Sequence, residues 1–279
     1  MATFTAPDGT TLVYDAYEPG RPPRAAVLVT HGWSEHAGRY AWLGARLRDA
    51  GLAAYVADLR GHGRSGGRRG HLSRFSQLLG DLQAFRRVVR ARADVPQVLL
   101  GHAFGALVVL RYLETQPTVP PVAAVVSGPL LGLPYAIPLW KQLAERLLGD
   151  LWPGLAVPTA VDIEHLCRDP ASNAAYRADP AVQRRVTVGA WREIRWAQRA
   201  IAADAGRVES PVLFLLAGED RIVDVAAARA FADTLRAPAP VRWYGEMYHE
   251  VLNDPQRERV VDDVLAFLAD PATTGTRAS

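Results

Sequence analysis

A short turn flanked by glycines carries alanine where a nucleophile could sit. In the segment Leu99–Ala106, Gly101 and Gly105 stand two residues before and two residues after Ala103. This is the spacing of a nucleophile elbow, Gly-x-Ser-x-Gly, whose central residue adopts a strained backbone and presents its side chain above a sheet edge. The flanking glycines remove side chains that would collide across the turn. The turn therefore predicts nucleophilic catalysis, although the hydroxyl that this chemistry requires is replaced by a methyl group.

Two residues later in the chain could serve as the acid and the base of a catalytic triad. Asp220 closely follows an apolar segment typical of a strand, and His249 lies in the loop after another such segment. The order nucleophile, acid, base is a known triad order, and catalytic groups gather beyond the carboxyl ends of parallel strands. His249 would act as general base, and Asp220 would hold its tautomer and stabilise the imidazolium. Glu219 and Asp224 are rival acids, but the placement favours Asp220.

The elements that must position these residues follow from hydrophobic periodicity. Asp8-Gly9 predicts a hairpin between 3–5 and 11–17. Short, mostly apolar runs predict strands at 25–30, 52–58, 98–100, 123–126, 211–217 and 241–244, and the first two are typical of buried strands. Segments with helical spacing predict helices at 40–49, 73–92, 104–113, 225–235 and 255–268. This alternation indicates an α/β fold with a mostly parallel sheet and helices on both faces.

The alternation of strands and helices stops between about residues 129 and 206. This segment contains no convincing strand and is rich in Leu, Trp, Ala and Arg. We therefore predict a core formed by residues 1–128 and 207–279, with residues 129–206 inserted as a helical cap. Within the insertion, Asp179-Pro180 is typical of a helix N-cap and first turn.

Several longer motifs surround the candidate triad residues. They are His31–Tyr40, Asp58–Ser65, Gly101–Ala106, Gly218–Asp224 and Tyr248–Glu250. Together they resemble the monoacylglycerol lipase / lysophospholipase family of α/β-hydrolases, in the order and spacing of that family. The resemblance implies an α/β-hydrolase fold with a cap, and a carboxylic ester hydrolase that acts on acyl lipids such as monoacylglycerols or lysophospholipids.

The resemblance also implies roles for individual residues. The position of the catalytic serine falls on Ala103, that of the acid on Asp220 and that of the base on His249. The two backbone N–H groups of the oxyanion hole would come from Trp33 and Phe104. The ligand would be a small acyl ester.

Three more residues concern the shape of the expected site. Glu35 and Arg39 correspond to polar residues of the family's alcohol pocket, but their i,i+4 spacing would equally suit a plain ion pair. Trp33 is larger than the small residue expected at its position, and this difference changes the predicted shape of the pocket.

The insertion carries an apolar stripe with helical spacing. Its members are Leu139, Leu143, Leu147 and Leu151. Packing inside the cap is the simplest explanation of such a stripe. Contact with an acyl chain or a transient contact with a membrane surface is the alternative. On that alternative, Leu143 and Leu147 are candidate substrate contacts.

Ala103 leaves three hypotheses open. The chain is a serine hydrolase inactivated by replacement of serine with alanine, or a natural non-catalytic relative that binds acyl ligands or a partner, or it performs another chemistry on the same fold, such as peptide, lactone or thioester cleavage. The intact acid, base and oxyanion positions favour the first hypothesis, because a long-decayed enzyme would be expected to lose its acid and base.

Bulk composition excludes several other classes of function. A net charge of +3 over 279 residues, without a basic run, argues against a nucleic-acid partner. Cys167 is the sole cysteine, so there is no disulfide framework. No signal peptide is recognisable, and no apolar run approaches the roughly 20 residues that span a bilayer. We expect a soluble, cytoplasmic protein.

Two short motifs point to cofactors, and we discount both. Residues 61–66 match the dinucleotide pattern Gly-x-Gly-x-x-Gly, with Asp81 at the place of its acid, but further glycines prevent a helix from starting in the loop. His31 and His36 lie in a pattern one residue longer than the zinc motif. We expect neither a metal nor an organic cofactor.

Overall fold

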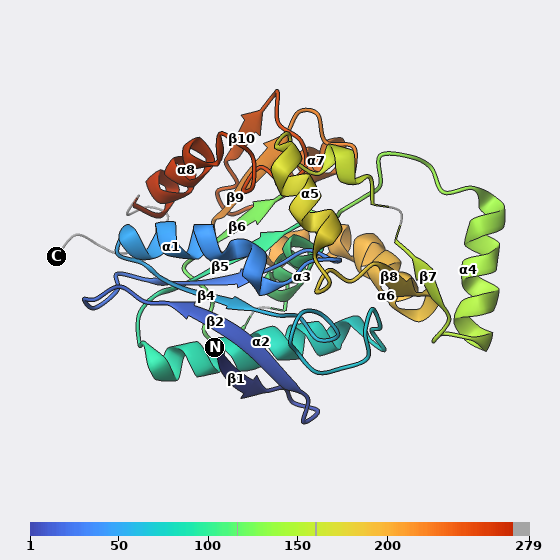
Figure 1. The fold of residues 1–279 in the computed structure, drawn as a ribbon, viewed down its shortest axis with the longest axis horizontal. Coiled ribbons are helices and arrows are strands. Elements are labelled where there is room, and N and C mark those ends of the chain that lie inside the picture. The colour runs from blue at the N-terminus through green and yellow to red at the C-terminus, as the bar shows by residue number, and fades with distance from the viewer. Residues whose placement is uncertain (116, 160, 270–279) are drawn as a thin grey trace.

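The computed structural model describes residues 1–115, 117–159 and 161–269, and it describes no side chains at residues 141–144, 146, 150 and 202. At its centre lies an eight-stranded sheet of order β1-β2-β4-β3-β5-β6-β9-β10 (Figure 1). The strands are β1 (Ala2–Thr5), β2 (Thr11–Tyr17), β3 (Ala26–Thr30), β4 (Ala53–Ala57), β5 (Gln97–His102), β6 (Ala123–Ser127), β9 (Val212–Ala217) and β10 (Val241–Tyr244). Within this sheet the β1–β2 and β2–β4 pairs are antiparallel, and the other pairs are parallel. The predicted α/β fold and opening hairpin are confirmed.

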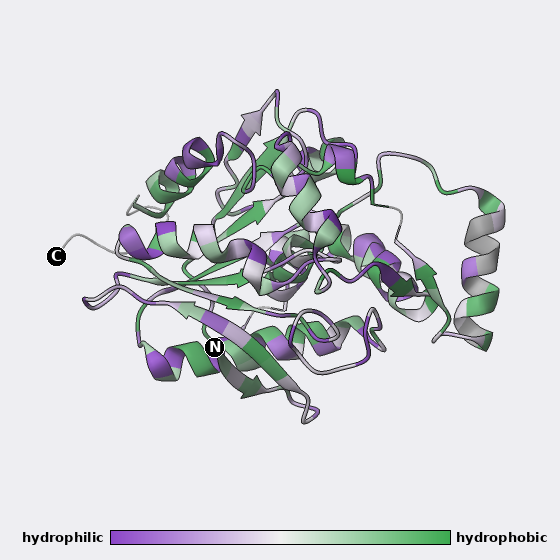
Figure 2. Cartoon of the chain, viewed as in Figure 1, coloured by the Kyte–Doolittle hydropathy of each residue, from purple (hydrophilic) through white to green (hydrophobic). Residues whose placement is uncertain are grey.

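Alternate residues of the buried strands pack on opposite faces of the sheet, as the period of two requires. Leu28 and Leu99 belong to a core with α2 (Phe75–Arg92), α3 (Phe104–Leu113) and α7 (Val225–Ala232). Their neighbours Val29 and Val98 belong to a second core with α1 (Ala41–Asp49) and α8 (Arg257–Ala269). Figure 2 shows the hydrophobic colour concentrated on the central strands. Both faces of the sheet are therefore covered, and its carboxyl edge is left for the site.

The chain between β6 and β9 forms α4 (Leu139–Leu151), β7 (Ala156–Pro158), α5 (Pro170–Ala178), β8 (Arg185–Thr187) and α6 (Val188–Ala200). β7 and β8 pair as a short antiparallel sheet, so the prediction of a segment without strands is wrong in this detail. The Asp179-Pro180 prediction is also wrong. Asp179 follows the end of α5, and the same dipeptide ten residues earlier, Asp169-Pro170, caps and opens that helix.

The glycine-rich loop that matched a dinucleotide motif holds the inserted segment against the core. The Thr187 N–H donates to the carbonyl of Gly70 at 2.9 Å, and Arg68 donates to the carbonyl of Gly154 at 2.6 Å. Gly70 has φ +62°, and a Cβ on it would lie 2.5 Å from the Arg185 carbonyl oxygen. Glycine is needed here because the backbone of β8 approaches so closely.

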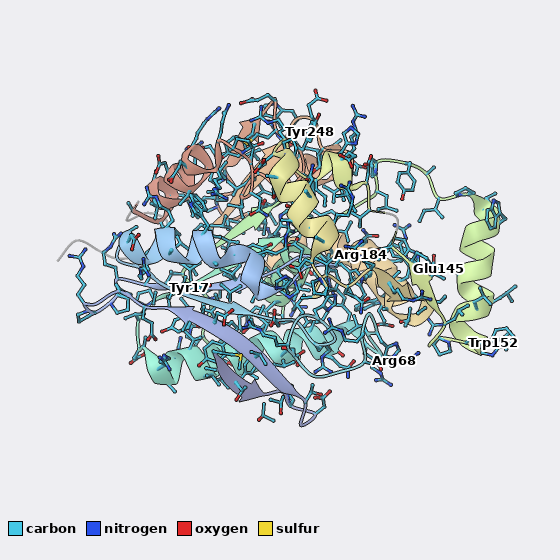
Figure 3. All side chains as sticks on the ribbon, viewed as in Figure 1. Tyr17, Arg68, Glu145, Trp152, Arg184 and Tyr248 are labelled. Carbon is cyan, nitrogen blue, oxygen red and sulfur yellow. The ribbon has the colours of Figure 1, made fainter. Side chains whose placement is uncertain are left out.

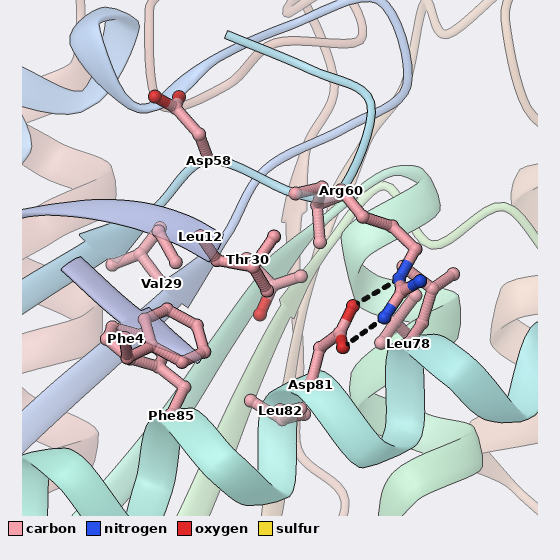
Figure 4. Close-up of a pocket in the computed structure, with 13 residues that line it drawn as sticks. Phe4, Leu12, Val29, Thr30, Asp58, Arg60, Leu78, Asp81, Leu82 and Phe85 are labelled. Carbon is pink, nitrogen blue, oxygen red and sulfur yellow. Dashed lines mark hydrogen bonds and ion pairs between the residues drawn. The ribbon is translucent and has the colours of Figure 1, made fainter. Parts of the chain in front are cut away.

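A buried ion pair holds the start of this loop on α2. Nε and Nη2 of Arg60 each lie 2.6 Å from an oxygen of the Asp81 carboxylate (Figure 4). Nη1 of Arg60 donates to Asp8 at 2.7 Å. A cavity of about 20 Å³ beside the pair has room for a single water. Asp81 therefore serves the fold. None of the helices within the described residues is long and apolar enough to cross a membrane.

Candidate active site

Ala103 stands at a sharp turn between β5 and α3. Its backbone has φ 48° and ψ −111°, a left-handed φ that costs a non-glycine residue about 1–3 kcal/mol. A Cβ on Gly101 would lie 2.6 Å from the Cα of Ala106, and one on Gly105 would lie 2.0 Å from the Thr30 carbonyl oxygen. The turn therefore has the glycine requirements and the strained centre of a nucleophile elbow.

His249 and Asp220 form a hydrogen-bonded pair beside this turn. Nδ1 of His249 lies 2.7 Å from Oδ2 of Asp220, and both side chains are buried. The other carboxylate oxygen, Oδ1, accepts the backbone N–H groups of Ile222 and Val223 at 2.8 and 3.0 Å. These bonds fix the carboxylate, and the carboxylate in turn fixes the ring of His249.

The pKa values of the pair move apart. Burial alone would raise the pKa of Asp220, but His249 and the two backbone amides hold it below its ordinary value. Burial alone would lower the pKa of His249, but the Asp220 carboxylate holds it above its ordinary value. Gly128, with φ +49°, leaves room for the pair, because a Cβ there would lie 3.1 Å from Nδ1 of His249. The arrangement suits a general base that becomes an imidazolium.

The rival acids have other positions. Oδ1 of Asp224 accepts the N–H of Ala227 at 3.0 Å and caps the N-terminus of α7. Glu219 is exposed to solvent. Of the three candidate acids, it is Asp220 that the structure brings to His249.

Ala103 and His249 open onto one cavity of about 520 Å³. Trp33, Glu35 and Phe104 also line it. Most of the remaining wall is apolar and comes from core and insertion alike; examples are Leu130, Val157, Val186, Trp191, Ile194 and Ile222. Its size and apolar lining are typical of sites for small organic ligands.

The two expected oxyanion donors lie on either side of the turn. Phe104 is the first residue of α3, where backbone N–H groups have no partner within the helix. Trp33 follows Gly32, and a Cβ on Gly32 would lie 3.4 Å from the Cβ of Ala103. The loop after β3 therefore touches the elbow, as an oxyanion hole built from these two residues requires.

Glu35 and Arg39 form an ion pair, which Glu250 extends. Arg39 donates to both carboxylate oxygens of Glu250 at 2.7 Å, and its Nη1 lies 3.3 Å from Oε2 of Glu35. Burial raises the pKa of Glu35, whereas burial of Glu250 is outweighed by Arg39, which lowers the pKa of that carboxyl. Of this predicted pair, the buried Glu35 lines the cavity, whereas Arg39 is not among the lining residues. Both interpretations of Glu35 are thus compatible with its position.

The comparisons with known proteins agree with this geometry. A family model described as "Serine aminopeptidase, S33" matches residues 21–256. The monoacylglycerol lipase of Mycolicibacterium smegmatis is 34% identical over 95% of each chain, and phospholipase YtpA of Bacillus subtilis is 30% identical over 88% of this chain and 95% of its own. The crystal structure of the Paleococcus ferrophilus monoacylglycerol lipase superimposes with a TM-score of 0.84 at 28% identity, over 92% of this chain and 98% of that one.

The chain belongs to the monoacylglycerol lipase / phospholipase family of α/β-hydrolases. The family and the fold that the motifs predicted are thereby confirmed.

The sequence analysis did not name two residues of this site, His102 and Glu250, as candidates. His102, beside the elbow, packs its ring 4.8 Å from that of His249, and burial lowers its pKa to about 3, so it is neutral. Glu250 was visible only as the neighbour of His249. With Glu35 they form a group compact enough to hold a metal ion. However, Arg39 binds both oxygens of Glu250 and brings a positive charge that disfavours a cation there.

Two predictions for the apolar stripe of α4 need correction: that it packs inside the cap, and that Leu147 contacts the substrate. The side chain of Leu143 lies outside the described residues. Leu147 and Leu151 are each 65% exposed, and neither lines the cavity. The helix packs on α6 through another side, because Glu145 accepts the indole N–H of Trp191 at 3.2 Å (Figure 3). The cavity wall from the insertion is built by β7, β8 and α6 instead.

Proposed function

We propose that this chain is a serine-type hydrolase of acyl-lipid esters, of the monoacylglycerol or lysophospholipid kind, with its nucleophile replaced by Ala103. The observation that carries the proposal is the meeting of a strained elbow and a buried His–Asp pair at one largely apolar cavity. The relatives named as a monoacylglycerol lipase and a phospholipase support the substrate class.

The geometry supports the following mechanism for the form with serine at position 103. Asp220 engages Nδ1 of His249, so Nε2 is the nitrogen available to take the serine proton. The serine oxygen then attacks the ester carbonyl, and the N–H groups of Trp33 and Phe104 stabilise the oxyanion. The imidazolium of His249 protonates the departing alcohol. Water, activated by the same nitrogen, hydrolyses the acyl-enzyme and releases the fatty acid.

As it stands, the chain keeps every part of this site except the hydroxyl. Its largely apolar cavity of about 520 Å³ is present with alanine at this position, so we expect ligand binding without turnover. This expectation also covers the second candidate function, a natural acyl-binding relative without catalysis. Thermal denaturation of the unaltered chain with monoacylglycerol or fatty acid should show stabilisation that rises with ligand concentration. No stabilisation by any acyl compound would count against a lipid site.

Restoring the nucleophile tests the catalytic part of the proposal. Ala103→Ser should raise kcat on p-nitrophenyl acyl esters by about a million-fold, the effect of a triad serine in subtilisin. A panel that adds thioesters, lactones and peptides separates ester hydrolysis from other chemistry on this fold. If the serine form is no faster than the unaltered chain on any substrate, the triad assignment is wrong.

The exposed face of α4 supports a transient contact with a lipid surface. Leu139, Leu147 and Leu151 are exposed, and so are Trp152 and Leu155 just beyond the helix. Exposed apolar patches of this kind mark interaction sites, and Trp and Leu suit a membrane interface. Co-sedimentation with phosphatidylcholine vesicles should fall when Leu147 and Leu151 are replaced by Glu. The matched control is Trp243→Glu on β10, where an exposed tryptophan lies on the core.

A further inference from the structure

Trp33 lies where three parts of the site meet. It belongs to the loop that touches the elbow, and it is a half-buried residue that lines the same cavity as Ala103. Family resemblance predicts a small side chain here, so the indole occupies space that a smaller residue would leave to the ligand.

Aromatic contacts hold the indole in one orientation. It meets the Phe104 ring edge-on at 5.1 Å and 83°, and the His62 ring at 4.8 Å and 82°. His62 is itself buried, with Nδ1 3.0 Å from the carbonyl oxygen of Arg60. Edge-to-face pairs of aromatic rings stabilise their arrangement beyond the effect of burial alone. The indole is therefore a fixed wall of the cavity.

The indole also reaches the inserted segment. Its Nε1–H donates to the carbonyl of Arg185 in β8 at 3.3 Å. β8 is tied to the core on its other side, where Thr187 bonds to Gly70 at 2.9 Å. Through this hydrogen bond Trp33 joins the elbow loop to β8, so its indole is held by both the core and the inserted segment.

We propose that Trp33 is a specificity-determining residue that restricts the acyl group next to the ester carbonyl and excludes substrates branched at that carbon. This inference rests on the proposed function. We expect the backbone N–H of Trp33 to bind the carbonyl oxygen of the ester. The side chain of the same residue therefore starts close to the reacting carbon. A rigid indole at that distance leaves room for a methylene but crowds a methyl branch.

The test compares linear and branched esters in the Ala103→Ser background. Trp33→Ala should raise the ratio of kcat/KM for p-nitrophenyl 2-methylbutanoate over p-nitrophenyl butanoate by at least about tenfold, since one methyl group in an apolar pocket is worth about 10- to 200-fold. Trp33→Leu keeps apolar packing and should shift the ratio in the same direction if the alanine variant folds poorly. Trp191→Ala is the matched control, because it removes another cavity-lining indole from α6 and should leave this ratio unchanged.

The outcomes are separable from those of the proposed function. An active serine form whose Trp33 variants keep the parent's ratio overturns the inference but leaves the hydrolase proposal intact. An equal shift in Trp191→Ala also overturns it. If the serine form has no turnover, the hydrolase proposal fails, and calorimetric binding of dodecanoate and 2-methyldodecanoate to the unaltered chain and its Trp33→Ala variant decides the inference. Equal preference in both chains rejects it.

Discussion

Side chains are placed in opposite ways in two regions: the corner of the core formed by Ala103, Asp220, His249 and Glu250, and the α4 side of the inserted segment. At the corner, Asp220, His249 and Glu250 are buried and hydrogen-bonded, and Ala103 holds a strained backbone. At α4, large apolar side chains face solvent. In Figure 1, α4 lies at the outer edge of the molecule, far from the sheet that carries the corner.

This contrast separates chemistry from ligand selection. Buried charges that lack a partner are costly, so each group at the corner tolerates few replacements. Exposed apolar residues cost the fold little when replaced, and their role is contact with something outside the molecule. The wall between these regions, built by β7, β8 and α6, is where substrate preference should be encoded.

The largest effects should come from the corner. In the Ala103→Ser background, His249→Ala should lower kcat by about 10⁶ and Asp220→Asn by about 10⁴, because the variant amide stabilises the wrong tautomer of the base. Asp224→Asn should be mild, since Asn caps a helix nearly as well as Asp. Steady-state kinetics on one p-nitrophenyl ester ranks the three. An Asp224 variant slower than the Asp220 variant would overturn the choice of acid.

A smaller effect, on the preference for acyl chain length, should separate residues of the cavity wall from residues of α4. Ile194, in α6, lines the cavity, whereas Leu147 faces solvent. A buried methylene contributes roughly 0.8 kcal/mol, so Ile194→Ala should lower kcat/KM for a C12 ester by about tenfold relative to a C4 ester. Leu147→Ala removes a similar volume and should leave that ratio unchanged. If only Leu147→Ala changes this ratio, the apolar stripe of α4 contacts the acyl chain after all.

Regular elements were predictable from the sequence because their signals are local. The helix at 104–113 and the strand at 241–244 have the predicted bounds. β7 and β8 were missed because three residues are too few to show a period of two. The orientation of α4 was also missed. An amphipathic stripe shows that a helix has two faces but does not say which one meets the protein.

The site divides in the same way. Asp220 and His249 were found because strand ends and triad order place them. The Arg39–Glu250 pair could not be predicted from spacing, since 211 residues separate its partners. The four-residue spacing of Glu35 and Arg39 predicted an ion pair of these two residues alone, without Glu250. Which acidic side chains pair with Arg39 depends on what is buried next to it, and that is a property of the assembled fold.

The smallest expected effect concerns the pH dependence of stability at the corner, measured on the unaltered chain. The pKa of His249 is raised in the folded state, so its stabilisation is present below its unfolded pKa, about 6.5, and is lost as pH rises through the higher folded pKa. The pKa of Asp220 is lowered, so its stabilisation is present above about pH 4 and constant from there upward. Of the two members of the pair, it is therefore His249 whose contribution changes between pH 5.5 and 9.

Asp220→Asn removes the charge that raises the His249 pKa, and burial then disfavours the imidazolium. The difference in Tm between the unaltered chain and this variant should be larger at pH 5.5 than at pH 9. About 1 kcal/mol corresponds to roughly 2–4 °C for a chain of this size. Asp224→Asn should show a small difference that is equal at both values, because its cap bond involves no titrating partner. A gap for Asp220→Asn that stays constant or grows toward pH 9 would mean that the two buried groups do not share a proton-linked interaction, and the geometry at the corner would then lack its electrostatic basis.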